Sequence, residues 1–421
     1  MTSHALQLAQ ERPDFLQQLY PHARDADCFM QEATHTYYVH GTAYKRSVSG
    51  VWKVFFEEFD SATADRCMQK AQEGLRDQTA SVYWLYMYLA VRKRLEPGSP
   101  EFWQAADSAL LGARIFYKTG GLEARWTPET LHAKLQALLA SGAGKPKTGS
   151  CYFLAACAGC SVAELRELWN FNGNLESLKG TLLHKQAELY MQAMGQWQLQ
   201  RARNRVPVRE ILRELDAAGA ATLSLAMLEV APHTAVELWD HPMTQRYFAT
   251  ALPGPSPEFR RFEAWVRAHD DLSPYRSEWS IYDEDAEVAG QVDSLWFTEQ
   301  GSVVMADWKR ARELLSGDLQ RQRALSHNRF GLSHCRFAPD EPGPCRHLHD
   351  CAYNHYLVQQ HLYADLLRRK YDVDVCHMSL VQAHPDVGAT DNDFNEATLQ
   401  LQPELAGAVM RAFLAGWCKL L

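Results

Sequence analysis

Two aspartates and a lysine have the types and spacing suited to phosphodiester hydrolysis. Asp293 ends the run AGQVD, and Asp307 follows fourteen residues later, with Lys309 two positions beyond it. Hydrolysis of a phosphodiester at neutral pH needs a divalent metal ion that neutralises developing charge and activates water, and a nearby cation helps. Because Mg²⁺ prefers carboxylate oxygens, two aspartates on adjacent strands can form an open metal site.

The spacing of Asp307 and Lys309 places both side chains on one face of a strand. Side chains alternate along a strand, so residues two apart point the same way. The ammonium group would then lie beside a metal-holding carboxylate, where it would orient or help to deprotonate the attacking water, or stabilise the pentavalent phosphate. The main-chain carbonyl of Trp308 is available as a further metal ligand.

Three short β-type runs must position these side chains. They cover residues 278–282, 288–297 and 303–308, and Gly301 marks a hairpin between the last two. A hairpin would bring the two aspartates side by side.

Helices are expected before and after these strands in the sequence. The capping box at Ser161 predicts a helix to about Trp169, and a second helix begins near Ser177. An amphipathic helix at 354–371 and a strand at 373–385 follow the long Arg- and His-bearing loop. This order predicts an α/β fold in which a mixed central sheet is flanked by helices.

The chain is expected to divide into three parts. Residues 35–48 alternate aromatic or β-branched side chains around Gly41, which predicts a β-hairpin turning near His40. The spacing of Trp, Leu and Ala from about 60 to 140 is helical. The expected parts are an N-terminal hairpin plus helical region at 1–160, a core at 161–390 and a C-terminal helix at 391–421.

Four motifs together resemble a known family. The run EWSIYDEDAEVAGQVDSLWFTEQGSVVMADWKRA resembles the second and third motifs of RecB-type PD-(D/E)XK nucleases, in which a Gly-x-x-Asp strand precedes an Asp-x-Lys strand. Upstream, GTLLHKQAE resembles the Gly-x-x-x-His motif of that branch. Downstream, QQHLYADLL resembles its Gln-x-x-x-Tyr helix. The four motifs occur in family order, and the resemblance covers about residues 161 to 385.

The resemblance implies a Mg²⁺-dependent or Mn²⁺-dependent DNA nuclease, an exonuclease by its branch. The core at 161–390 would then be a restriction-endonuclease-like PD-(D/E)XK core, with a helical N-terminal region before it. Lys309 would be the catalytic lysine, and the metal ligands would be His184, Asp293, Asp307 and the carbonyl of Trp308.

Four further residues receive supporting roles from the same resemblance. Glu278 would be an additional acidic residue of the catalytic site. Glu188 lies one helical turn after His184 and would hold its ring or an outer-shell water. Gln359 and Tyr363, one turn apart, would position the lysine or touch the DNA backbone.

Contact with DNA must use a local basic strip, because the formal net charge of the chain is -8. Arginines beside the site and in the loop beyond it are the candidates: Arg310, Arg312, Arg321, Arg323, Arg329, Arg336 and Arg346. Trp296, Trp308 and Phe330 could stack on unpaired bases, although packing inside the sheet is the stronger expectation for Trp308. The expected partner is DNA that is single-stranded or has a free end.

Three alternatives stay open. A nuclease fold that has lost catalysis would serve as a nucleic-acid-binding or structural subunit. Cys157 and Cys160 form a CxxC next to a helix, the setting of a thiol redox site, but no repeating βαβ pattern surrounds it. A zinc-binding loop would use ligands at non-standard spacing, namely His334, Cys335, Cys345, His347, His349 and Cys351.

Composition bounds the class of protein. With 421 residues, 46% of them hydrophobic and 22% charged, the chain can bury a sizeable core. No segment approaches the roughly 18 apolar residues that span a bilayer, and the first thirty residues lack an apolar secretory run. The ten scattered cysteines fit reduced thiols, so we expect an intracellular protein of unspecified compartment without a membrane contact.

Overall fold

The computed structural model of the chain falls into two compact units. It describes residues 14–31, 34–55, 85–86, 89–90, 93–119, 127–141, 162–217, 256–311, 314, 344–345, 348, 352–385 and 394–420. The first unit contains Met1–Glu58, Lys179–His233 and Ala249–Leu421, and the second contains Phe59–Leu178 and Thr234–Phe248. The division differs from the three expected parts, because the N-terminal hairpin belongs to the same unit as the strands after residue 249.

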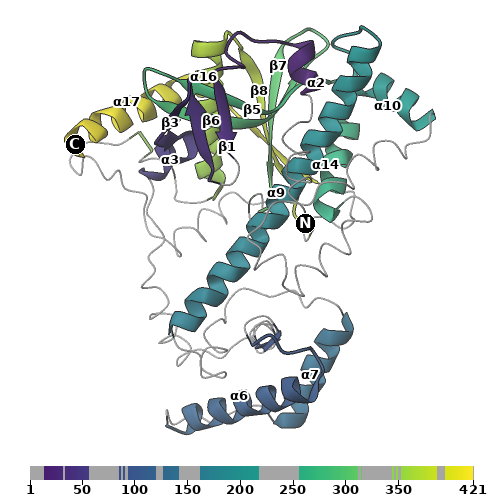
Figure 1. Ribbon diagram of the computed structural model, residues 1–421, viewed down its shortest axis with the longest axis vertical. Helices are drawn as coiled ribbons and strands as arrows, with labels where there is room; N and C mark the ends of the chain where they lie inside the picture. Colours follow the sequence, from purple (N-terminus) through teal and green to yellow (C-terminus); the bar gives the residue numbers. More distant parts are fainter. Residues whose placement is uncertain are drawn as a thin grey trace. The chain divides into compact units, whose positions relative to one another are not determined.

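A six-stranded mixed sheet forms the centre of the first unit (Figure 1). Its strands are β4 (Arg46–Ser47), β5 (Ser273–Asp283), β6 (Val288–Phe297), β7 (Val303–Lys309), β8 (Val375–Gln382) and β9 (Asn395–Leu399). The order is β4-β6-β7-β8-β9, and β5 also pairs with β6. β6 is antiparallel to β5 and β7, whereas β4 is parallel to β6 and β7 is parallel to β8. The predicted mixed α/β class is confirmed.

β6 and β7 separate at the point where the sequence places its aspartates. β5 pairs along the full length of β6, so β4 and β7 must share the other edge of that strand. β4 pairs with Val288 and Ala289, and β7 pairs with β6 only from Ser294 onward. Within the described ranges, residues 290–293 therefore have no strand partner on that edge, and Asp293 lies at a fork in the sheet.

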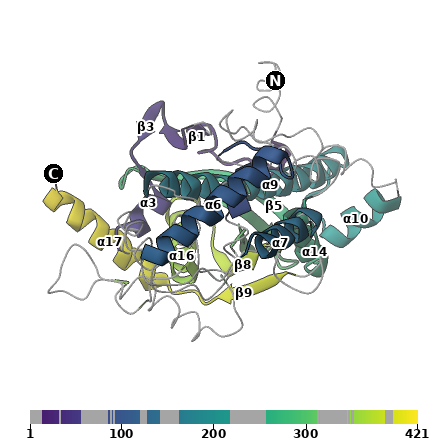
Figure 2. The same ribbon diagram turned by 90° about the horizontal axis from the view of Figure 1, so that it is seen from below.

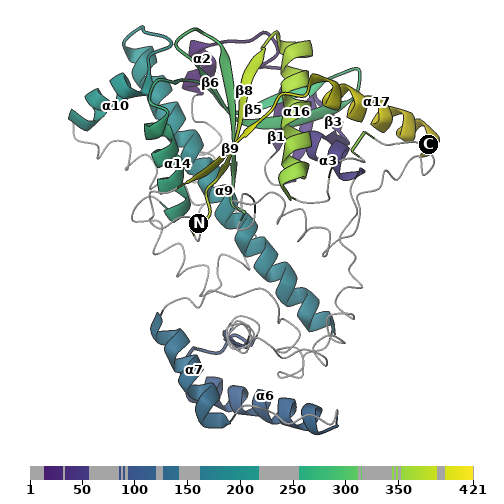
Figure 3. The ribbon, with the colours of Figure 1, turned by 180° about the vertical axis from the view of Figure 1, so that it is seen from behind.

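Helices cover both faces of the sheet (Figures 1 and 3). One core contains residues of α3 (Val48–Lys53), α16 (Ala352–Tyr371) and α17 (Pro403–Leu420). The other contains residues of α9 (Val162–Gln200), α10 (Val208–Ala217) and α14 (Pro257–Ala268). In the view from below, β8 and β9 lie between α16 and α14 (Figure 2). Side chains alternate between the two cores, as Leu295 and Trp296 do on β6.

The N-terminal segment forms a small antiparallel sheet. β1 (Cys28–Gln31), β2 (Thr36–Val39) and β3 (Thr42–Tyr44) pair in that order. The predicted hairpin is confirmed: His40 and Gly41 form its turn with φ angles of 47° and 77°, as a two-residue type I′ loop requires. Before this sheet, α2 (Phe15–Leu19) docks on α9 through backbone N–H groups that donate to Gln192 Oε1.

Two expected boundaries are wrong. The predicted helices from Ser161 and Ser177 are one continuous helix, α9, because extending an existing helix costs little and Ser177 does not interrupt it. Residues 391–421 were expected to form a helix only, yet β9 precedes α17 and pairs with β8. A five-residue edge strand has too weak a local pattern to be recognised without its partner.

The second unit is helical in its described part, as the sequence predicts. α6 (Pro100–Thr119) and α7 (Pro128–Ser141) contribute buried residues such as Phe102 and Leu135. Asp107 of α6 lies 2.7 Å from His132 of α7, from Oδ1 to Nε2. In the portions of the chain described above, no helix combines the length and apolar character needed to cross a membrane.

Gly290 permits α16 to lie close to β6. A Cβ atom at this position would lie 2.6 Å from Tyr363 Cε1 and 2.9 Å from Val48 Cγ2. Carbon atoms cannot approach so closely without displacement, so the helix packs where the strand lacks a side chain. The Gly-x-x-Asp spacing thus also places this contact three residues before Asp293.

We expect Gly290→Ala to lower the free energy of unfolding by about 1–3 kcal/mol, because the added methyl group overpacks the contact with Tyr363. Tyr363→Leu removes the ring that the methyl group strikes, so the double variant should lose less stability than the sum of the two single variants. Urea unfolding of all four proteins measures the coupling. Additive losses would show that Tyr363 is not the reason why position 290 requires glycine.

An ion pair links β9 to the end of α14. His269 Nε2 lies 3.3 Å from Glu396 Oε2. Burial raises the pKa of Glu396, but hydrogen bonds from His269, Ser379 and Trp265 outweigh it and lower the pKa to about 2. Its ionised form therefore stabilises the fold above the ordinary glutamate pKa, and this contribution is lost as the pH falls toward 2.

We expect Glu396→Gln to reduce the free energy of unfolding by about 1–3 kcal/mol at pH 6. The difference from wild type should shrink as the pH falls from 4.5 toward 2, because the wild-type carboxylate then becomes protonated. Urea titrations at several pH values measure it, with the exposed Glu404→Gln as control. A difference that does not change with pH would contradict the ion pair.

Candidate functional site

Three acidic side chains form a row across three neighbouring strands. The β5–β6 register pairs the neighbours of Glu278 with the neighbours of Asp293, so these two acids lie opposite each other. The β6–β7 register ends at Ser294 and Ala306, one step before Asp293 and Asp307. Glu278, Asp293 and Asp307 expose 17%, 10% and 2% of their side chains. The row is therefore largely desolvated.

The fork between β6 and β7 explains how Asp293 is held. Its Oδ2 atom accepts a hydrogen bond of 3.0 Å from the backbone N–H of Trp308. The carboxylate thus takes the place that a strand carbonyl would occupy if the ladder continued. The Asp293 side chain thus accepts the hydrogen bond of the Trp308 N–H group on β7 and also stays at the fork in the sheet.

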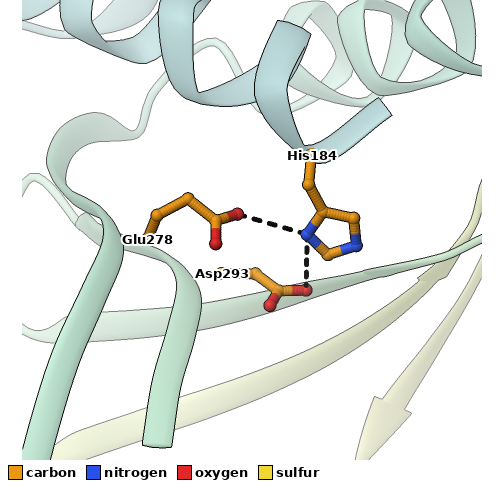
Figure 4. Close-up of side chains that lie close together, drawn as sticks. All are labelled: His184, Glu278 and Asp293. Atoms are coloured by element: carbon orange, nitrogen blue, oxygen red, sulfur yellow. Dashed lines mark hydrogen bonds and ion pairs between the residues drawn. The ribbon is translucent and has the colours of Figure 1, made fainter. Parts of the chain in front are cut away.

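His184 of α9 reaches the same point from the neighbouring helix (Figure 4). Its Nδ1 atom lies 3.2 Å from Glu278 Oε1 and 3.6 Å from Asp293 Oδ2. Its Nε2 atom lies 3.1 Å from the carbonyl oxygen of Trp308. Burial lowers the pKa of His184, but the two carboxylates outweigh burial and raise the pKa to about 9.

Lys309 and Asp307 form a buried pair at the other end of the row. Lys309 Nζ lies 2.9 Å from Asp307 Oδ1 and 2.8 Å from Asp307 Oδ2. It also lies 3.7 Å from Asp293 Oδ2, and 4.8 Å from the ring centroid of Tyr356. Gln360 Nε2 donates to Asp307 Oδ1 at 2.6 Å. The period-two spacing therefore produces the same-face pair that the sequence predicts.

Excess negative charge remains in this cluster. Burial and the neighbouring Asp293 raise the pKa of Asp307 to about 7. Burial raises the pKa of Glu278 to about 6, against the opposing effect of His184. Burial also raises the pKa of Asp293, but Lys309 and His184 outweigh it and lower the pKa. Three carboxylates thus face two cationic side chains, which leaves a net attraction for a further cation.

Glu278 adopts a strained backbone conformation. Its φ angle is 46°, in the left-handed region that glutamate rarely occupies, inside an otherwise extended strand. Such a conformation costs about 1–3 kcal/mol and persists where surrounding contacts impose it. Here the side-chain amide of Gln291 donates to the Glu278 carbonyl oxygen at 2.9 Å. In this conformation the Oε1 atom of Glu278 lies 3.2 Å from His184 Nδ1.

The donor atoms of this cluster fit a divalent cation. His184, Glu278 and Asp293 each offer one ligand atom, and the three atoms lie within 4.8 Å of one another. Two carboxylate oxygens and one imidazole nitrogen suit Mg²⁺ or Mn²⁺, and the nitrogen favours Mn²⁺. Asp307 lies outside this group of three, and its Oδ1 atom accepts hydrogen bonds from Lys309 and Gln360. Glu278 thus joins His184 and Asp293 in the group, and the expected roles of Asp307 and the Trp308 carbonyl as metal ligands remain predictions.

The residue that follows the expected Gln359 on α16 contacts the aspartate–lysine pair. Gln360, rather than Gln359, contacts Asp307, whereas Gln359 Oε1 is buried with no hydrogen-bond partner in the part of the chain described. Tyr363 is fully buried against Gly290, close to the carboxylates. Sequence reasoning missed Tyr356 and Gln360. The available signal is their spacing along α16: Gln360 follows Tyr356 by four residues and Tyr363 follows Gln360 by three, which places all three on one helix face.

Several residues expected to touch DNA have structural contacts instead. Arg310 Nε forms a 2.7 Å ion pair with Glu258, and the two side chains expose 7% and 0% of their surface. Trp296 and Trp308 are fully buried in the core beside α14, so neither can stack on a base.

Glu188, which was expected to hold the His184 ring or an outer-shell water, pairs with Lys185 at 2.7 Å. Both ring nitrogens of His184 contact other groups.

Other predicted features lie outside the described residues. These are the Ser161 capping box, the CxxC at Cys157 and Cys160, most of the Cys/His loop, and the arginines Arg312, Arg321, Arg323, Arg329, Arg336 and Arg346. Cys345 from that loop is described, and its side chain is buried. The redox, zinc and DNA-strip hypotheses therefore remain predictions.

No family model, characterised protein or solved structure matches this chain. The class of protein must therefore be inferred from the side chains gathered at the end of the sheet.

We expect Mn²⁺ to stabilise the wild-type protein by about 2.7 kcal/mol at a concentration one hundred times its dissociation constant, because folded ligands bind it and the unfolded chain does not. His184→Ala and Asp293→Asn should lose most of this stabilisation. Thermal unfolding with and without Mn²⁺, together with calorimetric titration, measures the effect. Glu188→Gln, whose side chain is paired with Lys185, should keep the full shift. Equal shifts in all four proteins would remove the metal from this cluster.

Proposed function

We propose that the chain is a Mg²⁺- or Mn²⁺-dependent DNA nuclease of the PD-(D/E)XK superfamily, related to the RecB-like exonuclease branch. The observation that supports this best is the row of Glu278, Asp293 and Asp307 across adjacent strands, with Lys309 bound to its last member. The four sequence motifs in family order support the superfamily. The proposal of DNA with a free end as substrate comes from the same resemblance.

Each side chain has a separate task in this proposal. Glu278, Asp293 and His184 hold the metal ion, which supplies charge neutralisation and a water molecule of lowered pKa. Lys309 places a cation beside the carboxylates, where it attracts the scissile phosphate and stabilises the charge that develops on it. Asp307 and Gln360 keep that lysine in place. Hydrogen bonds within the protein hold Asp293, Asp307 and Lys309, so these groups are oriented before substrate arrives.

We expect cleavage of end-labelled single- or double-stranded linear DNA with Mg²⁺ or Mn²⁺, and none in EDTA. Asp293→Asn and Lys309→Gln should each reduce the rate by about 100-fold or more, because they remove stabilisation of the transition state. Asn keeps the shape of Asp293. Gln at position 309 removes the cation but retains N–H donors for the buried Asp307, which truncation to alanine would not. The exposed Lys45→Ala serves as control.

The design separates the alternatives. Circular DNA should resist cleavage if the enzyme requires an end. DNA binding without cleavage under every metal condition would favour the catalytically silent nuclease fold. Cleavage in EDTA, or wild-type rates in both variants, would contradict the metal-dependent mechanism.

A further inference from the structure

The face of α16 toward the sheet contacts both members of the Asp307–Lys309 pair. Tyr356 and Gln360 are four residues apart, which places them one turn apart on the same helix face. Gln360 donates to Asp307, and the Tyr356 ring lies over the ammonium group of Lys309. One rigid helix therefore holds the carboxylate with one side chain and the cation with the other.

The ammonium group of Lys309 has carboxylates on one side and an aromatic face on another. Both oxygens of Asp307 lie within 2.9 Å, and the ring centroid of Tyr356 lies 4.8 Å from Nζ. The negative face of an aromatic ring attracts a cation, most strongly when both are shielded from water. Lys309 exposes only 15% of its side chain, so the attraction acts in a largely desolvated setting.

If carboxylates were its only partners, Lys309 would be held only by anions that compete with the phosphate for its N–H donors. An aromatic face attracts the charge but offers no lone pair that could replace a phosphate oxygen as hydrogen-bond acceptor. It also blocks the motion of a four-carbon stem that is otherwise flexible. The ring can therefore keep the ammonium group at the site when a phosphate enters, without satisfying the donors that the phosphate needs.

We propose that Tyr356 is a positioning residue that holds the Lys309 ammonium group at the carboxylate row through its aromatic face. The role of Lys309 in phosphodiester cleavage rests on the proposed function, whereas the effect of the ring on the lysine does not depend on it. The ring, and not the phenol hydroxyl, carries the effect. A phenylalanine at position 356 should therefore still hold the Lys309 ammonium group in place, and an aliphatic side chain should not.

The first test compares steady-state cleavage by wild type, Tyr356→Phe and Tyr356→Leu. Tyr356→Phe should keep kcat within about twofold, and Tyr356→Leu should lower kcat by about 5- to 30-fold, the range of a desolvated cation–π contact. KM should change less than kcat, because the position of Lys309 matters most for the charge that develops on the phosphate in the transition state. Tyr353→Leu, one turn earlier on α16 and also half-buried, is the matched control and should match wild type.

The second test needs no nuclease activity. Trace acetylation of the folded protein, read by mass spectrometry, should label Lys309 several-fold faster in Tyr356→Leu than in wild type or Tyr356→Phe. The exposed Lys45 should react equally in all proteins. Tyr356→Met provides a second aliphatic variant if leucine disturbs folding, which near-ultraviolet circular dichroism will reveal.

The outcomes separate the two proposals. If wild type does not cut DNA while Lys309 labelling rises in the aliphatic variants, the nuclease function is wrong and the positioning by Tyr356 stands. If wild type cuts DNA and the aliphatic variants match it in kcat and labelling, the positioning role is wrong. Equal losses in Tyr356→Phe and Tyr356→Leu would also overturn it, because the hydroxyl would then carry the effect.

Discussion

Charge balance at the open end of the sheet is the constraint on which the other features depend. Glu278, Asp293 and Asp307 come from three adjacent strands and are largely desolvated, so their mutual repulsion is little screened. Lys309 and His184 offset part of it, one from β7 and one from α9. Neither cation alone spans the row. The sheet and two helices must therefore meet at this point.

The fold meets this requirement with devices that each have a second use. Separation of β6 from β7 frees a backbone N–H, and Asp293 accepts it while keeping its carboxylate in the row. The missing side chain at Gly290 admits Tyr363, which brings α16 against β6. That approach places Gln360 and Tyr356 on the aspartate–lysine pair. Packing of the core and orientation of the site thus follow from the same contacts.

Neighbouring residues of one strand serve different purposes because their side chains alternate. Trp308 lies between Asp307 and Lys309 in sequence, yet it faces the other core and packs edge-on to Phe262 and Trp265. Arg310, just beyond β7, is taken up by Glu258 at the start of α14. Proximity in sequence to a reactive lysine therefore does not make a residue a substrate contact. Apart from Arg310, the arginines expected to bind DNA belong to the 312–346 stretch.

Local patterns in the sequence were sufficient for the extent of β6, the hairpin at Gly301, and the common face of Asp307 and Lys309, because strand alternation and turn geometry act over a few residues. Only the tertiary structure decided which glutamine contacts Asp307, since Gln359 and Gln360 differ by 100° of helix rotation and packing selects between them. It also decided the strained conformation of Glu278 and the pairing of β9. These depend on partners distant in sequence, whose contacts no local pattern encodes.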